Sequence, residues 1–391
     1  MTDNSNGRRL AKDELEKIVR YDDVEKLTYA ELVDDFREMP SLAEHRPTGI
    51  CRVDPRNGDR VIYTPKRSAR PTEFRPKRHA TVKIPRLECP VCNADTTSAV
   101  DVAPLTDGYT FINKNMFPIV SFDFPGHEQP QTHEPDLDRN RQIGTYSQGG
   151  HWLQWLSTVH EADLHNMEIE DIVTVLKRLA VFEGFLFRSS DSNMPVWTGP
   201  VGRKFYGFVC IIRNFGQLGG ASLAHGHIQI AHTNIIPRAL LDDRNFFAAH
   251  KRSFGDFMLS ENPAYLNIRD FGEKMRLLVP YFMKRPYSSF LICKDISKSC
   301  LHQFDDSDIE ALAVALTTIT KGIKYILEDK LERSFAYNLI FHNGPVGTFY
   351  IEVVPHSQEL GGFEQMGLYI CQSTPVVSAD GYREAFQALG I

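Results

Sequence analysis

The segment from Ala221 to Ala231 (ASLAHGHIQIA) limits what this chain can fold into more than any other stretch. Read as a β-strand, it places His225, His227 and Gln229 on one face, while the isoleucines between them point into a core on the other. A glycine-rich stretch (NFGQLGG, residues 214–220) precedes it, and glycine lets backbone N–H groups approach a phosphate closely. The combination predicts a sheet that carries nucleophilic chemistry at phosphorus.

The composition is that of an ordinary globular protein. The 391 residues are 42% hydrophobic and 24% charged, which is enough for one large core or two domains. The formal net charge of −6 argues against a general nucleic-acid binder. The first residues are polar, and no apolar run is long enough to span a bilayer. We therefore expect a cytoplasmic protein with no nucleic-acid or membrane partner.

The cysteines point to a metal site, not to disulfide bonds. Their number, seven, is odd, and only Cys89 and Cys92 lie close together in the sequence. In a reducing compartment this pattern favours free thiols and at most one metal site. A CxxC motif supplies two thiolates to a zinc ion, and without a second CxxC the other two ligands have to be distant histidines. Alone, the motif leaves metal binding, redox chemistry and chance open.

The order of apolar segments predicts an internal repeat. A pattern of strand, helix, strand and strand occurs in residues 46–257 and again in residues 258–391, after a charged helical extension over residues 1–45. In the second copy, residues 349–352 (FYIE) stand where the first copy has its histidines, so this half lacks a nucleophile. We expect an α+β fold with two similar halves, each a mainly antiparallel sheet flanked by helices, that can join into one sheet.

In its sequence motifs the chain resembles the galactose-1-phosphate uridylyltransferase-like branch of the histidine-triad superfamily. His225, His227 and Gln229 match its His-x-His-x-Gln motif. Further family motifs are matched in order from about residue 50 to 375: Arg52 to Gly58, then Arg67, Arg70 and Pro71, Cys89 and Cys92, Glu161 and His165, Asn214, Gly220 and Ser222, and finally Gly362, Phe363 and Glu364.

The resemblance implies a zinc site formed by Cys89, Cys92, His165 and His225. Four such ligands leave no open position, so the zinc would be structural. It would hold the strand that carries His227, because His225 lies two residues earlier. The family has a second metal site that uses a His-x-His near the C-terminus. The corresponding stretch here reads Phe-Tyr, so we expect no second metal site.

The resemblance also implies a nucleotidyltransferase or phosphorylase mechanism. His227 would attack the α-phosphorus of a nucleoside diphosphate sugar or a dinucleotide, while its other ring nitrogen donates to a backbone carbonyl. The nucleotidyl group would then pass to phosphate or a sugar phosphate. The implied site comprises His227, Gln229 and Ser222 for catalysis, Arg67, Arg70, Asn115, Asn214 and Gly220 for the nucleotide and its phosphates, and Glu352 and Glu364 for the acceptor. The family commonly forms homodimers, so we expect one here.

Other functions compete with this interpretation. A hydrolase would use water as the acceptor, but a glutamine at residue 229, in place of a third histidine, favours transfer by the family pattern. A zinc-stabilised nucleotide-binding protein without activity would not need His227 and Gln229. A metallohydrolase that uses His225, His227 and His232 would lack the nearby carboxylates that such sites usually have.

Overall fold

The computed structural model describes residues 9–39, 42, 44–45, 50–53, 60–62, 89–122, 144–190, 194–199, 202–344 and 347–391. Its centre is a ten-stranded sheet in which every pairing is antiparallel. In spatial order the strands are β11 (Asn267–Phe271), β12 (Met275–Leu278), β13 (Ser289–Cys293), β15 (Tyr350–Pro355), β14 (Tyr337–His342), β9 (Phe208–Phe215), β10 (His227–Thr233), β6 (Gly149–Trp155), β4 (Tyr109–Lys114) and β3 (Ala99–Pro104). The predicted α+β class with a mainly antiparallel sheet is confirmed.

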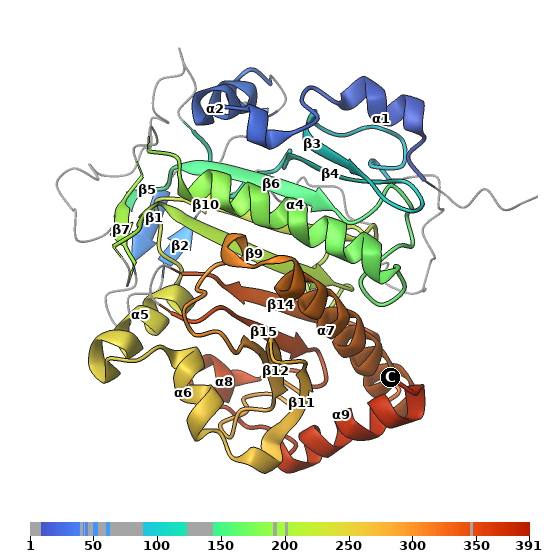
Figure 1. Ribbon diagram of the computed structural model, residues 1–391, viewed down its shortest axis with the longest axis vertical. Helices are drawn as coiled ribbons and strands as arrows, with labels where there is room; N and C mark the ends of the chain where they lie inside the picture. Colours follow the sequence, from blue (N-terminus) through green and yellow to red (C-terminus); the bar gives the residue numbers. More distant parts are fainter. Residues whose placement is uncertain are drawn as a thin grey trace, which may run out of the picture.

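The sheet contains the predicted repeat. Strands β9, β10, β6, β4 and β3 come from the first half of the chain, and β14, β15, β13, β12 and β11 follow in the mirrored order from the second. The two sets join where β9 pairs with β14, so that Ile212 lies opposite Ile340 and Asn214 opposite Asn338. The halves therefore form one continuous sheet (Figure 1).

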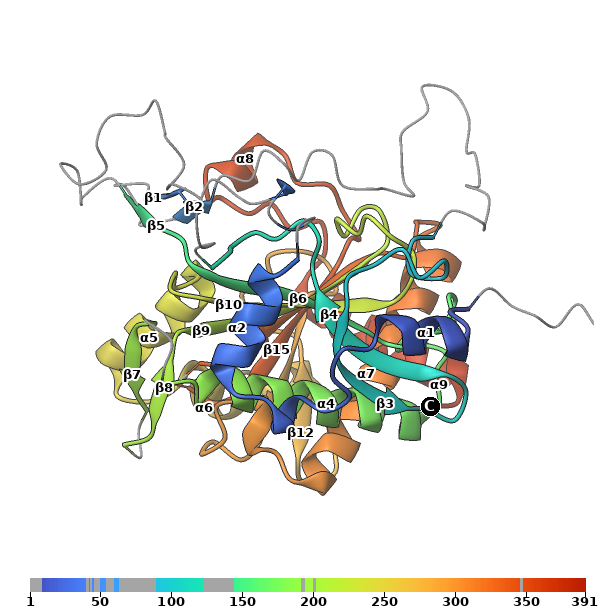
Figure 2. The ribbon, with the colours of Figure 1, turned by 90° about the horizontal axis from the view of Figure 1, so that it is seen from above.

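Two long helices cover one face of this sheet. Helices α4 (Ile169–Phe187) and α7 (Asp306–Lys324) each bury an apolar stripe at helical spacing against the strands. The isoleucines of β10, Ile228 and Ile230, belong to that same core, as the alternation predicted. His227 and Gln229 consequently face the opposite side of the sheet. Helix α8 (Gly362–Gln365) lies on that opposite side, away from α4 (Figure 2).

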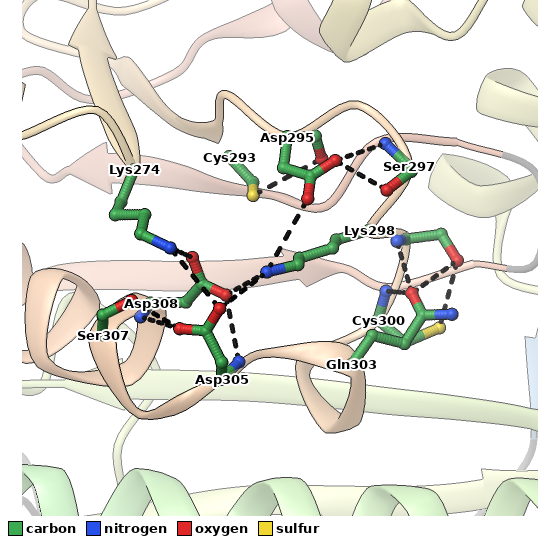
Figure 3. A network of polar contacts seen from close by, with 11 residues as sticks. Lys274, Cys293, Asp295, Ser297, Lys298, Cys300, Gln303, Asp305, Ser307 and Asp308 are labelled. Atoms are coloured by element: carbon green, nitrogen blue, oxygen red, sulfur yellow. Dashed lines mark hydrogen bonds and ion pairs between the residues drawn. The ribbon is translucent and has the colours of Figure 1, made fainter.

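The start of α7 is fixed by a charged network (Figure 3). The side chain of Asp305 accepts a hydrogen bond from the backbone N–H of Asp308, and Asp308 accepts one from the N–H of Asp305. The fully buried carboxylate of Asp308 is also paired with Lys274 at 3.0 Å and with Lys298. This pairing offsets the cost of burying the carboxylate and anchors the helix to the loop after β13.

The N-terminal extension packs on the first half. It contains α1 (Lys12–Ile18) and α2 (Tyr29–Arg37). The hydroxyl of Tyr29 lies 3.0 Å from Nδ1 of His232 on β10, and Asp35 forms a buried ion pair with Lys114 at 2.8 Å. The other α-helices and β-strands of the described residues are β1 (Ile50–Val53), β2 (Arg60–Ile62), β5 (Gly144–Tyr146), β7 (Val196–Thr198), β8 (Lys204–Tyr206), α5 (Arg238–His250), α6 (Phe254–Glu261) and α9 (Pro375–Leu389). Among the described helices, none has the length and apolarity that crossing a membrane requires.

Candidate functional site

A small cavity lies over the N-terminal end of β10, on the face of the sheet opposite α4. Its volume is about 120 Å³. Five residues that the sequence predicted for the site line it together: Asn115, Gly220, Ser222, His227 and Gln229. The backbone of Gly220 has a φ of 80°, a left-handed conformation that favours glycine and completes the turn before β10. The cavity also borders the CxxC knuckle through Pro90 and Val91.

The imidazole of His227 is held in one orientation. Its Nδ1 lies 2.8 Å from the carbonyl oxygen of His225, so Nδ1–H donates to that carbonyl and Nε2 keeps its lone pair. This is the backbone hydrogen bond that the nucleophilic mechanism requires. Burial of the ring, together with the nearby charge of Arg213, lowers the pKa of His227 to about 3. The ring is therefore neutral at physiological pH.

A buried ion pair fixes the backbone on which His227 sits. The guanidinium of Arg213 donates to the carbonyl oxygens of His227 at 2.7 Å and Asn214 at 3.0 Å, and it pairs with Asp163. Arg213 and Asp163 are both buried. Neither residue was predicted from the sequence. The available signal was an arginine directly after the apolar run of residues 208–212 (FVCII), where a buried charge needs a partner.

Next to the cavity lies a buried cluster of four metal-ligating side chains. Cys89, Cys92, His160 and His225 place one ligand atom each within 4.8 Å of one another. The distances from Nδ1 of His225 to Sγ of Cys89 and Cys92 are 3.7 and 3.5 Å, and that from Nδ1 of His160 to Sγ of Cys92 is 3.4 Å. A tetrahedral zinc ion bound by sulfur and imidazole nitrogen separates such atoms by about 3.6 Å. The arrangement therefore fits a tetrahedral metal ion.

The protonation states around the cluster also suit a metal. Nε2 of His225 donates to the carbonyl oxygen of Ser157 at 2.8 Å, which leaves Nδ1 free to coordinate. The pKa of the Cys89 thiol lies far below its usual range, chiefly because of the hydrogen bond with Cys92 and with further help from His160 and His225. A thiolate is the form of cysteine that binds a metal.

The structure places one of the predicted zinc ligands outside this cluster. His160 completes the cluster, and His165 lies outside it. The ring of His165 packs edge-on against Phe215 and Phe335, with centroids 5.7 and 5.2 Å away. Both histidines belong to the loop between β6 and α4. In that loop the N–H of Asp163 donates to the side chain of Asn166 and closes a turn that contains His165.

Other predicted residues lie elsewhere. Asn214 is not among the residues that line the cavity; its side-chain oxygen accepts a hydrogen bond from Asn338 at 2.8 Å. Glu352 and Glu364 line a different, larger cleft in the C-terminal half. Arg67 and Arg70 lie outside the described residues.

A second group of metal-ligating residues joins α4 to the loop before α7. Glu183, Cys300 and His302 place their ligand atoms within 4.8 Å of one another, at a position where the sequence predicted no metal site. In this structure hydrogen bonds occupy the Glu183 carboxylate, from Nδ1 of His302 at 2.8 Å and from Nδ2 of Asn343 at 2.7 Å. The group therefore forms a hydrogen-bonded link between the two halves.

Known proteins share this fold and part of the sequence. No family model matches the chain. The chain is 22% identical over 348 residues to the ADP-glucose phosphorylase of Arabidopsis thaliana, an alignment that covers 85% of this chain and 92% of that protein. The alignment with a solved uridylyltransferase structure covers 87% of this chain and 99% of that chain, with a TM-score of 0.64 at 17% sequence identity. The alignment with the solved structure of Arabidopsis thaliana ADP-glucose phosphorylase with bound ADP-glucose covers 85% of this chain and 98% of that chain. Its TM-score is 0.58, at 19% sequence identity.

These similarities confirm the resemblance and the fold that the sequence motifs predicted. The predicted class of activity agrees with the name of the curated Arabidopsis thaliana relative, which is a sugar-nucleotide phosphorylase.

Proposed function

We propose that this chain, a relative of the uridylyltransferase-like enzymes of the histidine-triad superfamily, transfers a nucleotidyl group from a sugar nucleotide by way of His227. One observation carries the proposal. A neutral imidazole faces a small cavity, its Nδ1 is anchored to a backbone carbonyl, and the glycine loop and Gln229 line the same cavity. A lone-pair nitrogen held in this way is suited to attack phosphorus.

The reaction takes two displacement steps at the same phosphorus atom. Nε2 of His227 forms a bond to the α-phosphorus, and the bond from that phosphorus to the bridging oxygen breaks, which releases a sugar 1-phosphate. An oxygen of the acceptor phosphate then attacks the nucleotidyl-histidine, and the P–N bond breaks to restore the imidazole. Ser222 and Gln229 donate hydrogen bonds to the non-bridging oxygens, where negative charge grows in each transition state.

The substrate that we propose is a nucleoside diphosphate sugar. The Arabidopsis thaliana relative is named for phosphorolysis of ADP-glucose. We therefore place inorganic phosphate first among the acceptors, with a sugar phosphate as the acceptor of a transferase variant of the same reaction. Asn115 lines the same cavity, and we propose that it contacts the nucleoside.

We propose zinc as the metal of the Cys89, Cys92, His160 and His225 cluster. Two thiolates and two imidazoles form a complete tetrahedral set, so a bound zinc supplies rigidity and no open coordination position. Because His225 also provides the carbonyl that anchors His227, fixing its side chain fixes the nucleophile. Four zinc ligands that include two free thiols are suited to a reducing compartment, which supports a cytoplasmic location.

We also propose a homodimer. The segment on and after α8 exposes a series of apolar side chains: Phe363, Met366, Leu368 and Ile370 are between 51% and 83% exposed. A monomer rarely exposes so many neighbouring apolar residues, so a second copy of the chain is the proposed cover. Light scattering of the purified protein measures its mass directly.

Turnover by a His227→Ala protein tests the proposed activity. With ADP-glucose or UDP-glucose and inorganic phosphate, the wild type is expected to release glucose 1-phosphate. The variant is expected to lose at least a thousandfold in kcat, because no other group can form the intermediate. A His250→Ala protein, altered at an exposed histidine of α5, is the matched control and should keep its activity. Full turnover by His227→Ala would disprove the mechanism.

A further inference from the structure

A series of hydrogen bonds runs from the loop before β13 to the glycine loop beside the His227 cavity. Nη1 of Arg285 donates to Nδ1 of His356 at 3.4 Å, and Nε2 of His356 lies 2.7 Å from Oδ1 of Asn338. Nδ2 of Asn338 then donates to Oδ1 of Asn214 at 2.8 Å. We call these four side chains the relay, because they connect the C-terminal half to the proposed phosphate site.

The relay can run in one direction only. A guanidinium donates hydrogen bonds and accepts none, so Nδ1 of His356 must accept from Arg285. Burial and the charge of Arg285 lower the pKa of His356 to about 4, so the ring is neutral and carries its hydrogen on Nε2. Nε2–H therefore donates to Oδ1 of Asn338, which turns the Nδ2 group of that amide toward Asn214. The same Nδ2 donates to the carbonyl oxygen of Gly219 at 2.7 Å, an atom that can only accept.

The last group of the relay is an N–H donor at the glycine loop. Because Oδ1 of Asn214 accepts from Asn338, the Nδ2 group of Asn214 is left to face elsewhere. This Nδ2 lies 4.0 Å from the place that a Cβ on Gly220 would occupy, and Gly220 lines the His227 cavity. In the part of the chain that the structure describes, no group accepts a hydrogen bond from it. An N–H group suits the non-bridging oxygens of a phosphate, whereas the opposite amide orientation would present an oxygen that repels them.

Backbone contacts hold the first two members of the relay next to each other. The N–H of His356 donates to the carbonyl oxygen of Ala336 at 2.9 Å, which continues the pairing of β14 with β15 by one step. The hydroxyl of Ser357 donates to the carbonyl oxygen of Pro286 at 2.7 Å, so the loop that carries Arg285 stays beside the end of β15. Neither contact uses the side chain of His356 or Arg285. Replacing those side chains should therefore change the relay and spare the backbone around it.

We propose that Arg285 and His356 are positioning residues for phosphate binding at the His227 cavity. They set the direction of the relay, so that Asn214 presents its N–H group, and not its oxygen, to the phosphate of the substrate. Neither residue touches the substrate, because both act through Asn338 and Asn214. This role rests on the proposed transfer at His227, which brings a phosphate to the glycine loop.

Steady-state kinetics with ADP-glucose or UDP-glucose and inorganic phosphate test this role. His356→Leu is expected to lower kcat/KM about tenfold, because the amide of Asn338 loses the donor that orients it. His356→Gln keeps an N–H group within reach of Asn338 and should stay within about threefold of the wild type. Arg285→Met leaves the ring in place but removes the group that fixes its tautomer, so kcat/KM should again fall. His250→Leu, at an exposed histidine of α5, is the matched control and should leave kcat/KM unchanged.

A second background distinguishes positioning from general structural support. If the relay acts through Asn214, adding His356→Leu to an Asn214→Ala protein should lower kcat/KM by less than about twofold, because the group that it orients is already absent. A merely structural His356 would give the same loss, about tenfold, in both backgrounds. That result would overturn the proposal, as would wild-type values of kcat/KM in both His356→Leu and Arg285→Met.

Hydrogen exchange of the substrate-free protein gives a readout that does not depend on turnover. Three backbone hydrogen bonds close the glycine loop over residues 216–221, and Asn338 holds it through the Gly219 carbonyl. His356→Leu is expected to speed amide exchange in the peptide that contains this loop, and His356→Gln to leave it unchanged. If the wild type shows no turnover, the proposed function at His227 fails and the exchange rates alone decide the relay. Equal rates in the wild type and His356→Leu would then overturn it.

Discussion

Asn214 and Asn338 face each other directly across the pairing of β9 with β14, and Nδ2 of Asn338 donates to Oδ1 of Asn214 at 2.8 Å. The same amide group donates to the carbonyl oxygen of Gly219 at 2.7 Å. The C-terminal half therefore holds the glycine loop that lines the His227 cavity. Through this contact, the half that lacks the His-x-His motif reaches the glycine loop of the site.

Replacing Asn338 with alanine should loosen that loop. The Gly219 carbonyl and the Asn214 amide each lose a partner, which is expected to cost about 1–3 kcal/mol of stability. The KM for the sugar nucleotide should rise severalfold, because the loop would be less well ordered for phosphate binding. Steady-state kinetics and urea unfolding measure the two effects. Asn245→Ala, at an exposed site on α5, is the control, and equal kinetics for both variants would contradict the assigned role of Asn338.

Variants of Arg213 and Asp163 test whether their buried ion pair holds the backbone of His227 in place. Arg213→Met leaves the Asp163 carboxylate buried without its partner, and we expect a loss of about 3–5 kcal/mol in the free energy of unfolding. The double variant Arg213→Met with Asp163→Leu removes both charges and should recover part of that stability. Because neither protein can hold the His227 carbonyl, activity should stay low in both. A double variant less stable than Arg213→Met would contradict the pairing.

The zinc content of two variants distinguishes the role of His160 from that of His165. His160→Ala should lower the zinc content of the purified protein from about one ion per chain to well below that, because one of four ligands is lost. His165→Ala should keep its zinc, although removing its half-buried ring costs some stability. Elemental analysis of both proteins decides between the two residues. Loss of zinc from His165→Ala with retention in His160→Ala would restore the assignment made from the sequence.

The pH dependence of stability should reveal His342. Burial opposes its protonation, but the charges of Asp243 and Glu352 outweigh burial and raise its pKa from 6.5 to about 9 in the folded protein, so protonation favours the folded state. The resulting stabilisation is fully present below about pH 6.5 and is lost as the pH rises through 9; it amounts to about 3 kcal/mol at most. The melting temperature should fall across this window in the wild type and fall less in His342→Gln. Parallel curves for the two proteins would contradict the prediction.

Much of the fold could be predicted from local pattern. The two-residue period after residue 224 separated His227 and Gln229 from the buried isoleucines, and the structure keeps that division. Helices α1 and α2 lie within residues 1–45, where the charged sequence indicated short helices. Such features depend on neighbours in the sequence, so the sequence contains them.

Other features depend on contacts between distant parts of the chain. His160 and His165 are separated by one turn of the same loop, and only the folded path decides which of them reaches Cys92. The pairing of Asn214 with Asn338 needs the register between two strands that are more than 120 residues apart in sequence. The ion pair of Arg213 with Asp163 could not be assigned for the same reason, since a buried arginine indicates a partner without identifying it.

The most direct test of nucleotidyl transfer is to isolate the intermediate. The wild-type protein, mixed with ADP-glucose or UDP-glucose in the absence of phosphate and quenched in base, should gain the mass of one nucleotidyl group. Proteolysis should locate that group on His227, and treatment with acid should remove it. A protein that turns over the substrate with no such adduct, or with the adduct on another residue, would contradict the account.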